Sequence, residues 1–409
     1  MIVPHGLVLA QLGKGAGAPG GGPLRLAVAL FLGLTATSFG KWVWAAQELN
    51  PQLAALPSNQ WVKVSDPGPL HWVREAHAGL VYDSNRGTLL TFGSDTHGYG
   101  VSRDLDNEIH EFSPFTGTWL TLYERAPRRS YRADGKGYPI SGFGDPMPWA
   151  MHTYDALVFD PRWNALWVAA TLGPPFHNPV LDEAVGVTRD SLWVYDLRKW
   201  KWVMFQNRGK SPPPLFGGAA VYDSRRDTLV AYDSSGVWEL GPARDEWKHA
   251  TAESHHVTHF NMEYSPRSGK LFVFGGQTDG PDGALTNDVW VYSPGPTAGA
   301  EGKWERRRPA GDPCPEAQHY PVAYQPEADL FLLVPDHPKA GQSLTMVYEP
   351  SVDRYTRIVG AEMEPLGMNY MMVYDTRHRV FLLVKGGWRQ PPVVWAFRLD
   401  VWWREGTGQ

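Results

Sequence analysis

The segment Leu80-Val81-Tyr82-Asp83, followed by the polar turn Ser84–Gly87 and the apolar run Thr88–Phe92, decides the fold of this chain. Two short runs rich in β-branched and aromatic residues, separated by a polar turn, predict a β-hairpin. The same pattern recurs five more times, which makes it an internal repeat. The six copies centre on Val81-Tyr82-Asp83, Val158-Phe159-Asp160, Val221-Tyr222-Asp223, Glu263-Tyr264-Ser265, Ala323-Tyr324-Gln325 and Val373-Tyr374-Asp375.

A repeat with a core of about 40–50 residues is typical of a β-propeller, in which each copy forms one four-stranded blade. In each copy an aromatic strand (a) and an aliphatic strand (b) precede a variable connection, a third strand (c) and an outer strand (d). The outer strands open with an aromatic residue that we expect to pack blade against blade. These residues are Trp119, Trp202, Trp247, Trp304, Tyr355 and Trp402 or Trp403.

Six copies predict an all-β, six-bladed propeller over residues 59–405. The blades are expected near residues 72–123, 151–205, 216–250, 259–307, 319–358 and 369–405. Ring closure in propellers usually takes a strand from the other terminus. The run 60–64 has the pattern of an outer strand and is the favoured closing strand of blade six, while Val401–Arg404 is the alternative.

Two of the copies resemble the kelch-repeat family. The first carries His77, Tyr82, Leu90–Gly93, Asn107-Glu108, Phe112 and Trp119, and the second carries His259, Tyr264, Leu271–Gly276, Asn287–Tyr292 and Trp304. The double glycine of the family is complete only in the fourth copy. The resemblance implies the propeller fold and says little about activity, because kelch propellers include adaptors, sugar oxidases and sugar isomerases. Copper sugar oxidases of this type use His, Tyr and a Tyr-linked Cys. Cys314 has no matching local motif, and we expect an inert thiol.

The first 58 residues lie outside the repeat. Residues 13–23 are rich in Gly, Pro and Ala, and Arg25 precedes a mostly apolar stretch that ends at Gly40. About 14 such residues suit a secretory signal better than a membrane-spanning helix, which needs about 20. We therefore expect a disordered and signal region over residues 1–45, cleaved near Ala45, and a linker over residues 46–58. The alternative is an uncleaved anchor over residues 26–46.

The composition is that of an ordinary globular protein, with 43% hydrophobic and 20% charged residues. The net charge of −5 and the absence of a Lys/Arg block argue against a nucleic-acid partner. A single cysteine excludes an intramolecular disulfide, which an exported protein with a large core does not need.

The long connections are expected on one face of the propeller. Because successive strands are antiparallel, the b–c and d–a connections emerge on one face, and the a–b and c–d turns on the other. Loops on a rigid scaffold carry function disproportionately, so this long-loop face is the predicted binding face. Its long segments are residues 93–107, 124–151, 171–190, 206–215, 275–287 and 334–343. The two from blade two are expected to form a lid or wall over part of the channel mouth.

The residues that begin each strand a are expected to line the central channel. Counting five back from each aromatic residue gives His77, Tyr154, Gly217, His259, His319 and Asn369. Three histidines in one layer raise the hypothesis of a metal site, but only two come from adjacent blades, and no metal or other cofactor is expected. With residues of the long connections, the ligand-binding candidates are His77, His97, His152, Tyr154, His177, Arg189, His256, His259, Asp279, His319, His337, Asn369 and Trp388.

These features leave three hypotheses for function. The first is an exported, periplasmic or secreted, module that binds a protein or a glycan through the long-loop face. The second is an extracytoplasmic carbohydrate-active enzyme, isomerase-like or less readily oxidase-like, with its site at the channel mouth and Trp149 or Trp388 stacking on sugar rings. The third is an accessory subunit of a membrane complex, tethered by residues 26–46. No catalytic motif in the sequence selects the enzyme.

Overall fold

The computed structural model describes residues 48–66, 77–93, 106–172, 186–210, 212, 217–255, 257–278, 283–386 and 391–401. The predicted signal or anchor segment over residues 1–45 lies outside them. No helix within the described ranges is both long and apolar enough to span a bilayer.

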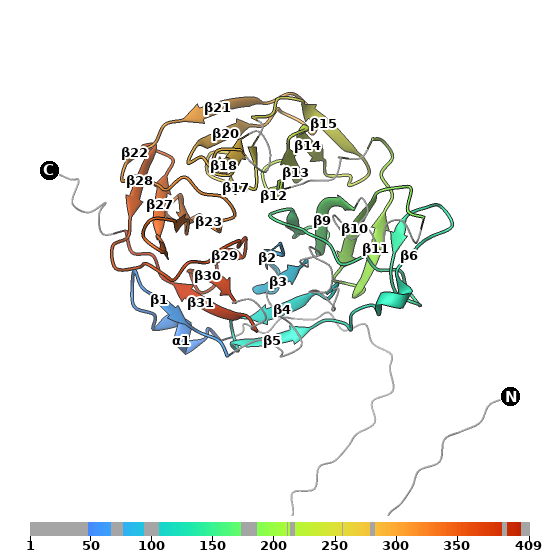
Figure 1. Cartoon of the computed structure of the whole chain (residues 1–409), viewed down its shortest axis with the longest axis horizontal. Helices are drawn as coiled ribbons and strands as arrows, with labels where there is room; N and C mark the ends of the chain where they lie inside the picture. The colour runs from blue at the N-terminus through green and yellow to red at the C-terminus, as the bar shows by residue number, and fades with distance from the viewer. Residues whose placement is uncertain are drawn as a thin grey trace, which may run out of the picture. The chain divides into compact units, whose positions relative to one another are not determined.

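Six antiparallel sheets stand around a common centre, as Figure 1 shows. The prediction of an all-β, six-bladed propeller is therefore confirmed. The strands of blades one to three, each from the inner strand outward, are as follows. Blade one has β2 (Gly79–Asp83), β3 (Thr88–Phe92), β4 (His110–Ser113) and β5 (Thr118–Thr121); blade two has β8 (Leu157–Asp160), β9 (Ala165–Leu172), β10 (Ser191–Asp196) and β11 (Lys201–Phe205); and blade three has β12 (Ala219–Asp223), β13 (Thr228–Asp233), β14 (Gly236–Leu240) and β15 (Trp247–Thr251).

Blades four to six follow the same order. Blade four has β17 (Asn261–Ser265), β18 (Lys270–Phe274), β20 (Val289–Ser293) and β21 (Lys303–Arg307); blade five has β23 (Val322–Gln325), β24 (Leu330–Leu333), β27 (Met346–Glu349) and β28 (Arg354–Arg357); and blade six has β29 (Met372–Asp375), β30 (Val380–Lys385), β31 (Val393–Phe397) and β1 (Trp61–Lys63).

The ring is closed by the N-terminal strand. β1 pairs antiparallel with β31 and is the outermost strand of the sixth sheet. The inner strands contact one another in chain order, and β29 contacts β2 to complete the circle. In blade five a short fifth strand, β22 (Ala310–Gly311), runs parallel to β28.

The repeated Asp has a local role in four of the six hairpins, and Ser265 and Gln325 stand at its position in the other two. Asp83 Oδ1 accepts hydrogen bonds from the backbone N–H groups of Asn85 and Arg86, and Asp160, Asp223 and Asp375 make equivalent bonds in their own turns. All six a–b turns have four residues, and each ends on a residue with positive φ. These residues are Gly87, Asn164, Asp227, Gly269, Asp329 and Arg379. An Asp that caps the turn and a final left-handed residue are the chemistry that a tight hairpin requires.

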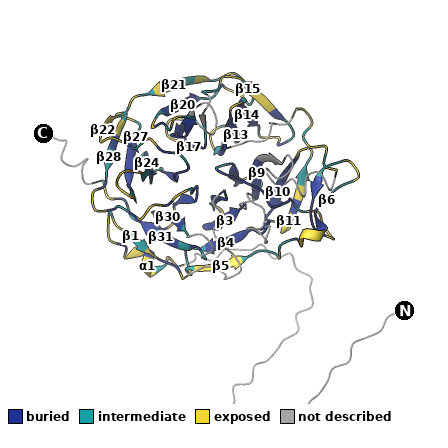
Figure 2. Ribbon diagram, in the orientation of Figure 1, coloured by how far each residue is buried: buried dark blue, intermediate teal, exposed yellow. Residues whose placement is uncertain are grey.

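Aromatic side chains fill the space within and between the blades. The outer-strand aromatics pack on those of the third strand, with Phe112 and Trp119 ring centroids 5.1 Å apart and Tyr195 and Trp202 5.2 Å apart. Trp202 also lies 4.9 Å from Phe92 of blade one, so it bridges two blades. Figure 2 shows the result, with buried inner strands and outer strands in which most residues are exposed or half-buried.

Part of the expected linker packs on the propeller. A short helix, α1 (Pro51–Ala54), is capped by the Asn50 side chain. Leu53 is buried with Val64 and residues of blades one and six, and the Leu53 carbonyl accepts a hydrogen bond of 2.6 Å from Arg398. Residues 50–56 therefore belong to the folded body in this structure.

The two faces of the ring differ as the loop lengths predicted. In the described chain the a–b turns have four residues and the c–d turns four to nine. The small additional elements all lie in b–c or d–a connections on the opposite, long-loop face. They are η1 (Arg128–Ser130) and the two-stranded sheets β6 (Arg132–Ala133) with β7 (Pro139–Ile140), β16 (Val257–Thr258) with β19 (Gln277–Thr278), and β25 (Asp336–His337) with β26 (Gln342–Ser343).

Candidate functional site

The predicted channel residues meet at the centre of the ring. Backbone hydrogen bonds link them from blade to blade: Tyr154 N–H donates to the His77 carbonyl at 2.9 Å, and His319 N–H donates to the His259 carbonyl at 3.1 Å. Asn369 N–H continues the series by donating to the His319 carbonyl at 2.9 Å. In each of these pairs, the residue that leads into the inner strand of one blade is hydrogen-bonded through its backbone to the equivalent residue of the next blade.

Four of these residues share an unusual backbone conformation. Tyr154, Gly217, His259 and His319 have φ between 48° and 62°, in the left-handed region. A residue other than glycine adopts it at a cost of about 1 kcal/mol or more, so the surrounding contacts must hold it there. The conformation turns each chain sharply before it enters the inner strand.

Six aromatic rings close the channel at this level, and we name them the channel cluster. They belong to His77, His152, Tyr154, His259, His319 and Tyr370, and each residue is buried. His77 and His152 are stacked with centroids 4.0 Å apart, and His259 and His319 lie 4.2 Å apart. Tyr154 lies between these two pairs, 5.3 Å from His77 and 5.8 Å from His259.

The polar atoms of the channel cluster bond mainly to one another. His152 Nδ1 lies 3.0 Å from Tyr154 Oη, and His319 Nδ1 forms a hydrogen bond with Tyr370 Oη. His259 Nδ1 lies 2.8 Å from Gln277 Oε1 at the base of the blade-four connection. These bonds satisfy groups that would otherwise destabilise the buried centre.

Burial favours the neutral form of the His259 and His319 imidazoles. It lowers the pKa of His319 to about 2, with further lowering by His259 and His77. Burial also lowers the pKa of His259, against the opposing effect of its bond to Gln277. In their neutral form these two rings do not present a charged acid or base to a ligand at the channel mouth. The channel cluster is therefore best described as a plug that ties five blades together.

A cavity of about 330 Å³ lies in the channel on the other side of the cluster. All six inner strands line it, and so do Ser224, Pro266, Pro326 and Thr376, which begin a–b turns. It therefore extends toward the short-turn face, whereas the sequence analysis placed the site on the long-loop face.

Two carboxyl groups line this cavity. Burial raises the pKa of Asp155 well above its ordinary value, against a hydrogen bond that Asp155 accepts from Met262 N–H at 2.8 Å. Burial likewise raises the pKa of Glu263, and the nearby Asp155 raises it further. Both residues retain partial exposure, because they face the cavity.

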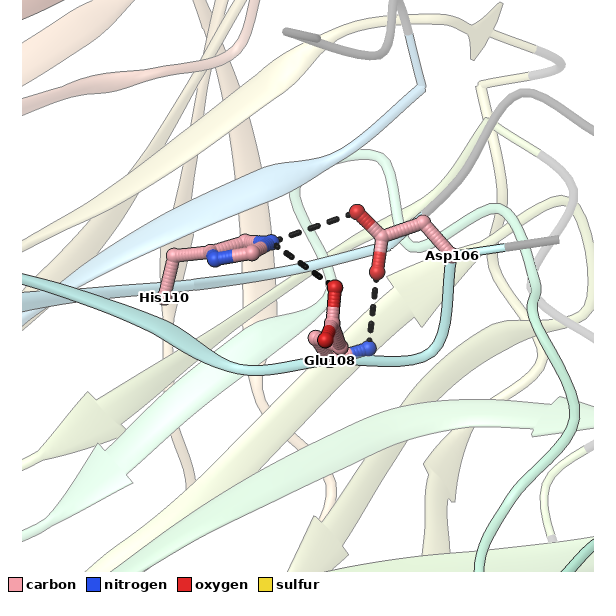
Figure 3. Close-up of side chains that lie close together, drawn as sticks. All are labelled: Asp106, Glu108 and His110. Carbon is pink, nitrogen blue, oxygen red and sulfur yellow. Dashed lines mark hydrogen bonds and ion pairs between the residues drawn. The ribbon is translucent and has the colours of Figure 1, made fainter. Parts of the chain in front are cut away.

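A second polar group, shown in Figure 3, lies at the start of β4. Asp106, Glu108 and His110 alternate along the chain, so all three side chains point to one side, and each residue is buried. His110 Nε2 lies 3.2 Å from Asp106 Oδ2 and 4.0 Å from Glu108 Oε2. Within the described part of the chain, this is a group whose ligand atoms, all within 4.8 Å of one another, suit a metal ion.

The same three residues also form a bonded network. Arg125 Nε lies 3.5 Å from Glu108 Oε2, and Arg125 N–H donates to Glu108 Oε1 at 3.1 Å. Thr121 Oγ1 lies 3.0 Å from His110 Nδ1. We interpret the group as a network that joins β4 to the d–a connection of blade one.

The remaining predicted candidates lie elsewhere. Asn369 is fully buried and bonds to the Val384 carbonyl and to Met371 N–H. Arg189 lies over the Tyr138 ring at 5.4 Å, and His337 Nδ1 accepts from Ala340 N–H. His97, His177, His256, Asp279 and Trp388 lie outside the described residues.

Two expectations about the long connections are wrong. Trp149 does not offer a stacking surface to a sugar, because it is 0% exposed and its Nε1–H donates to the Ile140 carbonyl. The insertion 124–151 does not form the expected lid over the channel mouth, and residues 173–185 of the second blade-two segment lie outside the described residues. Figure 1 shows β6 toward the periphery, on the outer side of blade two.

Sequence reasoning missed Tyr370, Asp155, Glu263 and the group at residues 106–110. Tyr370 and Asp155 each follow a counted channel position by one residue. Examining both neighbours of each counted position would have found them. The alternation of Asp106, Glu108 and His110 before an expected strand was a visible signal for the third group.

Comparison with known proteins adds little beyond the fold. No protein-family model matches the chain, and no curated protein matches it. Among solved structures, it is similar to TolB from Acinetobacter baumannii, at 10% identity and a TM-score of 0.41. The match covers 70% of this chain and 55% of that chain, so it spans about half the length of that protein.

Proposed function

We propose that this protein is an exported binding module that recognises a partner protein or a glycan through its long-loop face. The observation that carries the proposal is the asymmetry of the two rims. Among the described residues, the small additional sheets and the η1 turn lie on one face of the ring, while the other face has a–b turns of four residues and c–d turns of four to nine. Such decoration of one rim is typical of propellers and other scaffolds used for binding. The kelch resemblance agrees with this role.

The insertion between blades one and two is the proposed main contact. Phe143 is 67% exposed, and the Arg129 guanidinium lies over its ring at 5.6 Å. Arg128 and Lys136 are also exposed on this insertion. Exposed aromatic and arginine side chains are the residues that dominate binding energy at interfaces.

Export remains part of the proposal and is supported by the apolar stretch that follows Arg25. An extracytoplasmic location, periplasmic or secreted, agrees with a single cysteine, Cys314, that is buried and whose pKa burial raises to about 12. A tether through residues 26–46 is the variant of this proposal in which the segment is not cleaved. We prefer a binding role over an enzymatic role in carbohydrate turnover, because the polar atoms of the channel cluster bond mainly to one another and do not face a substrate as acid or base.

The test is site-specific photo-crosslinking in the native cells, with the photoreactive residue at position 143 or at position 352. Val352 lies in a c–d turn on the opposite face and is similarly exposed, at 60%, which makes it a matched control. We expect a discrete protein or glycan adduct from position 143 and none from position 352. Charge reversal by Arg129→Glu should reduce the adduct about tenfold or more. Equal labelling from both faces would contradict the proposal.

A further inference from the structure

We propose that the channel cavity is a binding site for a small organic cation of the alkylammonium type, held by the carboxyl groups of Asp155 and Glu263. The cavity extends toward the short-turn face, away from the long-loop face. The proposal is therefore independent of partner binding by the insertion.

The shape of the cavity suits a small molecule. Its volume of about 330 Å³ is at the lower end of the range for ligand pockets. Leucine, valine and methionine side chains form much of the wall, which fits an alkyl chain. The repeated aromatic position contributes one ring from every blade: Tyr82, Phe159, Tyr222, Tyr264, Tyr324 and Tyr374.

The charge of the cavity selects the cation. Its lining residues include Asp155 and Glu263 but no Lys, Arg or His. An anion would find no cationic side chain in this lining, and a purely apolar ligand would leave the remaining acceptor capacity of both carboxyl groups unused.

The carboxyl groups have acceptor capacity to spare. Asp155 receives one hydrogen bond, from Met262 N–H at 2.8 Å, whereas a carboxylate has lone pairs for about four. Glu263 follows Met262, whose N–H donates to Asp155, so blade two and blade four each contribute one carboxyl group to the same cavity. An ammonium group between them can donate to both.

Binding should be coupled to proton release. Burial raises the pKa of both carboxyl groups and so favours their protonated form in the empty cavity, and binding of an ammonium ion is therefore expected to displace a proton. The balanced step is the exchange of one carboxyl proton, released to buffer, for the N–H⁺ group of the ligand. The neighbouring titratable groups are the imidazoles of the channel cluster, the phenols of Tyr154 and Tyr370, and the phenols of the lining residues Tyr82, Tyr222, Tyr264, Tyr324 and Tyr374. Burial raises the pKa of the Tyr370 phenol, so it stays protonated.

The test is isothermal titration calorimetry of the full chain with n-butylammonium chloride and with 1-butanol, a neutral molecule of similar shape. We expect the ammonium ion to bind at least about tenfold more tightly than the alcohol. Its affinity should rise with pH, and its heat should depend on the ionisation enthalpy of the buffer. These wild-type measurements need no variant and remain informative if a variant misfolds.

Variants then assign the residues. Glu263→Gln keeps the shape and removes the charge, and it should weaken butylammonium about tenfold without changing 1-butanol. Glu301→Gln is the matched control, because Glu301 is exposed in the c–d turn of the same blade and does not line the cavity. Equal affinity for both probes, equal binding of potassium ions, or no binding at about 10 mM ligand would each overturn the proposal.

Discussion

Single residues with left-handed backbone build the centre of this propeller. Tyr154, His259 and His319 take positive φ values at the entry to their inner strands, where Gly217 does so in blade three. Gly217 has a second role, since its missing side chain leaves room for the His259 imidazole. One glycine therefore permits both the turn of its own blade and the packing of the next.

Replacing Gly217 by alanine should destabilise the fold through this contact. A Cβ at position 217 would lie 2.6 Å from His259 Cδ2 and 2.8 Å from His259 N. Gly367→Ala is the matched control, because Gly367 has the same φ of 62° but nothing within 4 Å. Both variants carry a left-handed alanine, which costs about 1 kcal/mol. In chemical denaturation Gly217→Ala should lose about 2 kcal/mol more than the control, and equal losses would disprove the packing role.

His319 should make stability depend on pH in the acid range. Its folded pKa of about 2 lies below the ordinary value of 6.5, so below pH 6.5 the unfolded state takes up the proton first. Its contribution is therefore complete above pH 6.5 and is lost as the pH falls from there toward 2. At about pH 4.5 the loss is about 3 kcal/mol. His319→Gln should flatten the fall of Tm between about pH 6.5 and 4.5; His337→Gln, outside the channel cluster, should follow the wild type.

At the scale of strands and turns, the repeat carried most of the information. The Val-Tyr-Asp triads predicted six inner strands because each residue type has a local reason: a β-branched residue for the strand, an aromatic for the inter-blade space, and Asp for the turn. Asp83 and its counterparts make those turn bonds. The same reasoning favoured residues 60–64 as the closing strand, and the pairing of β1 with β31 is what that choice requires.

The candidate site was less predictable, because it depends on distances across the ring. Counting positions brought His77, Tyr154, His259 and His319 to one level, but it did not show that their rings pack into a plug. The cavity beyond the plug depends on how far six inner strands stand from one another, which no local pattern encodes. In the sequence alone, Glu263 is therefore an ordinary strand residue and Asp155 an ordinary residue ahead of β8, and only the assembled ring brings them to one cavity.

For the propeller as a whole, closure joins the ends of the described chain. β1 pairs with β31, which lies more than three hundred positions later in the sequence. Beside this pair, the Asn59 side-chain amide donates to the Asp400 carbonyl, and Asp400 N–H donates to Asn59 Oδ1. Trp61 extends this closure to blade five. Its ring lies 4.9 Å from Phe397, and its Nε1–H donates to Thr345 Oγ1 at 2.8 Å.

Trp61→Ala should therefore weaken the entire ring. The substitution removes a large, partly buried contact and one hydrogen bond, so we expect a loss of about 3 kcal/mol and a lower Tm in scanning calorimetry. Because every blade packs on two neighbours, opening one junction exposes the edge of β31 and should lower the unfolding temperature of all six blades together. Trp200→Ala is the control, since Trp200 is 53% exposed in a c–d turn and should cost less than about 1 kcal/mol. If Trp61→Ala released only the N-terminal segment to protease and left the calorimetric transition unchanged, β1 would be an attached strand and not the closure of the ring.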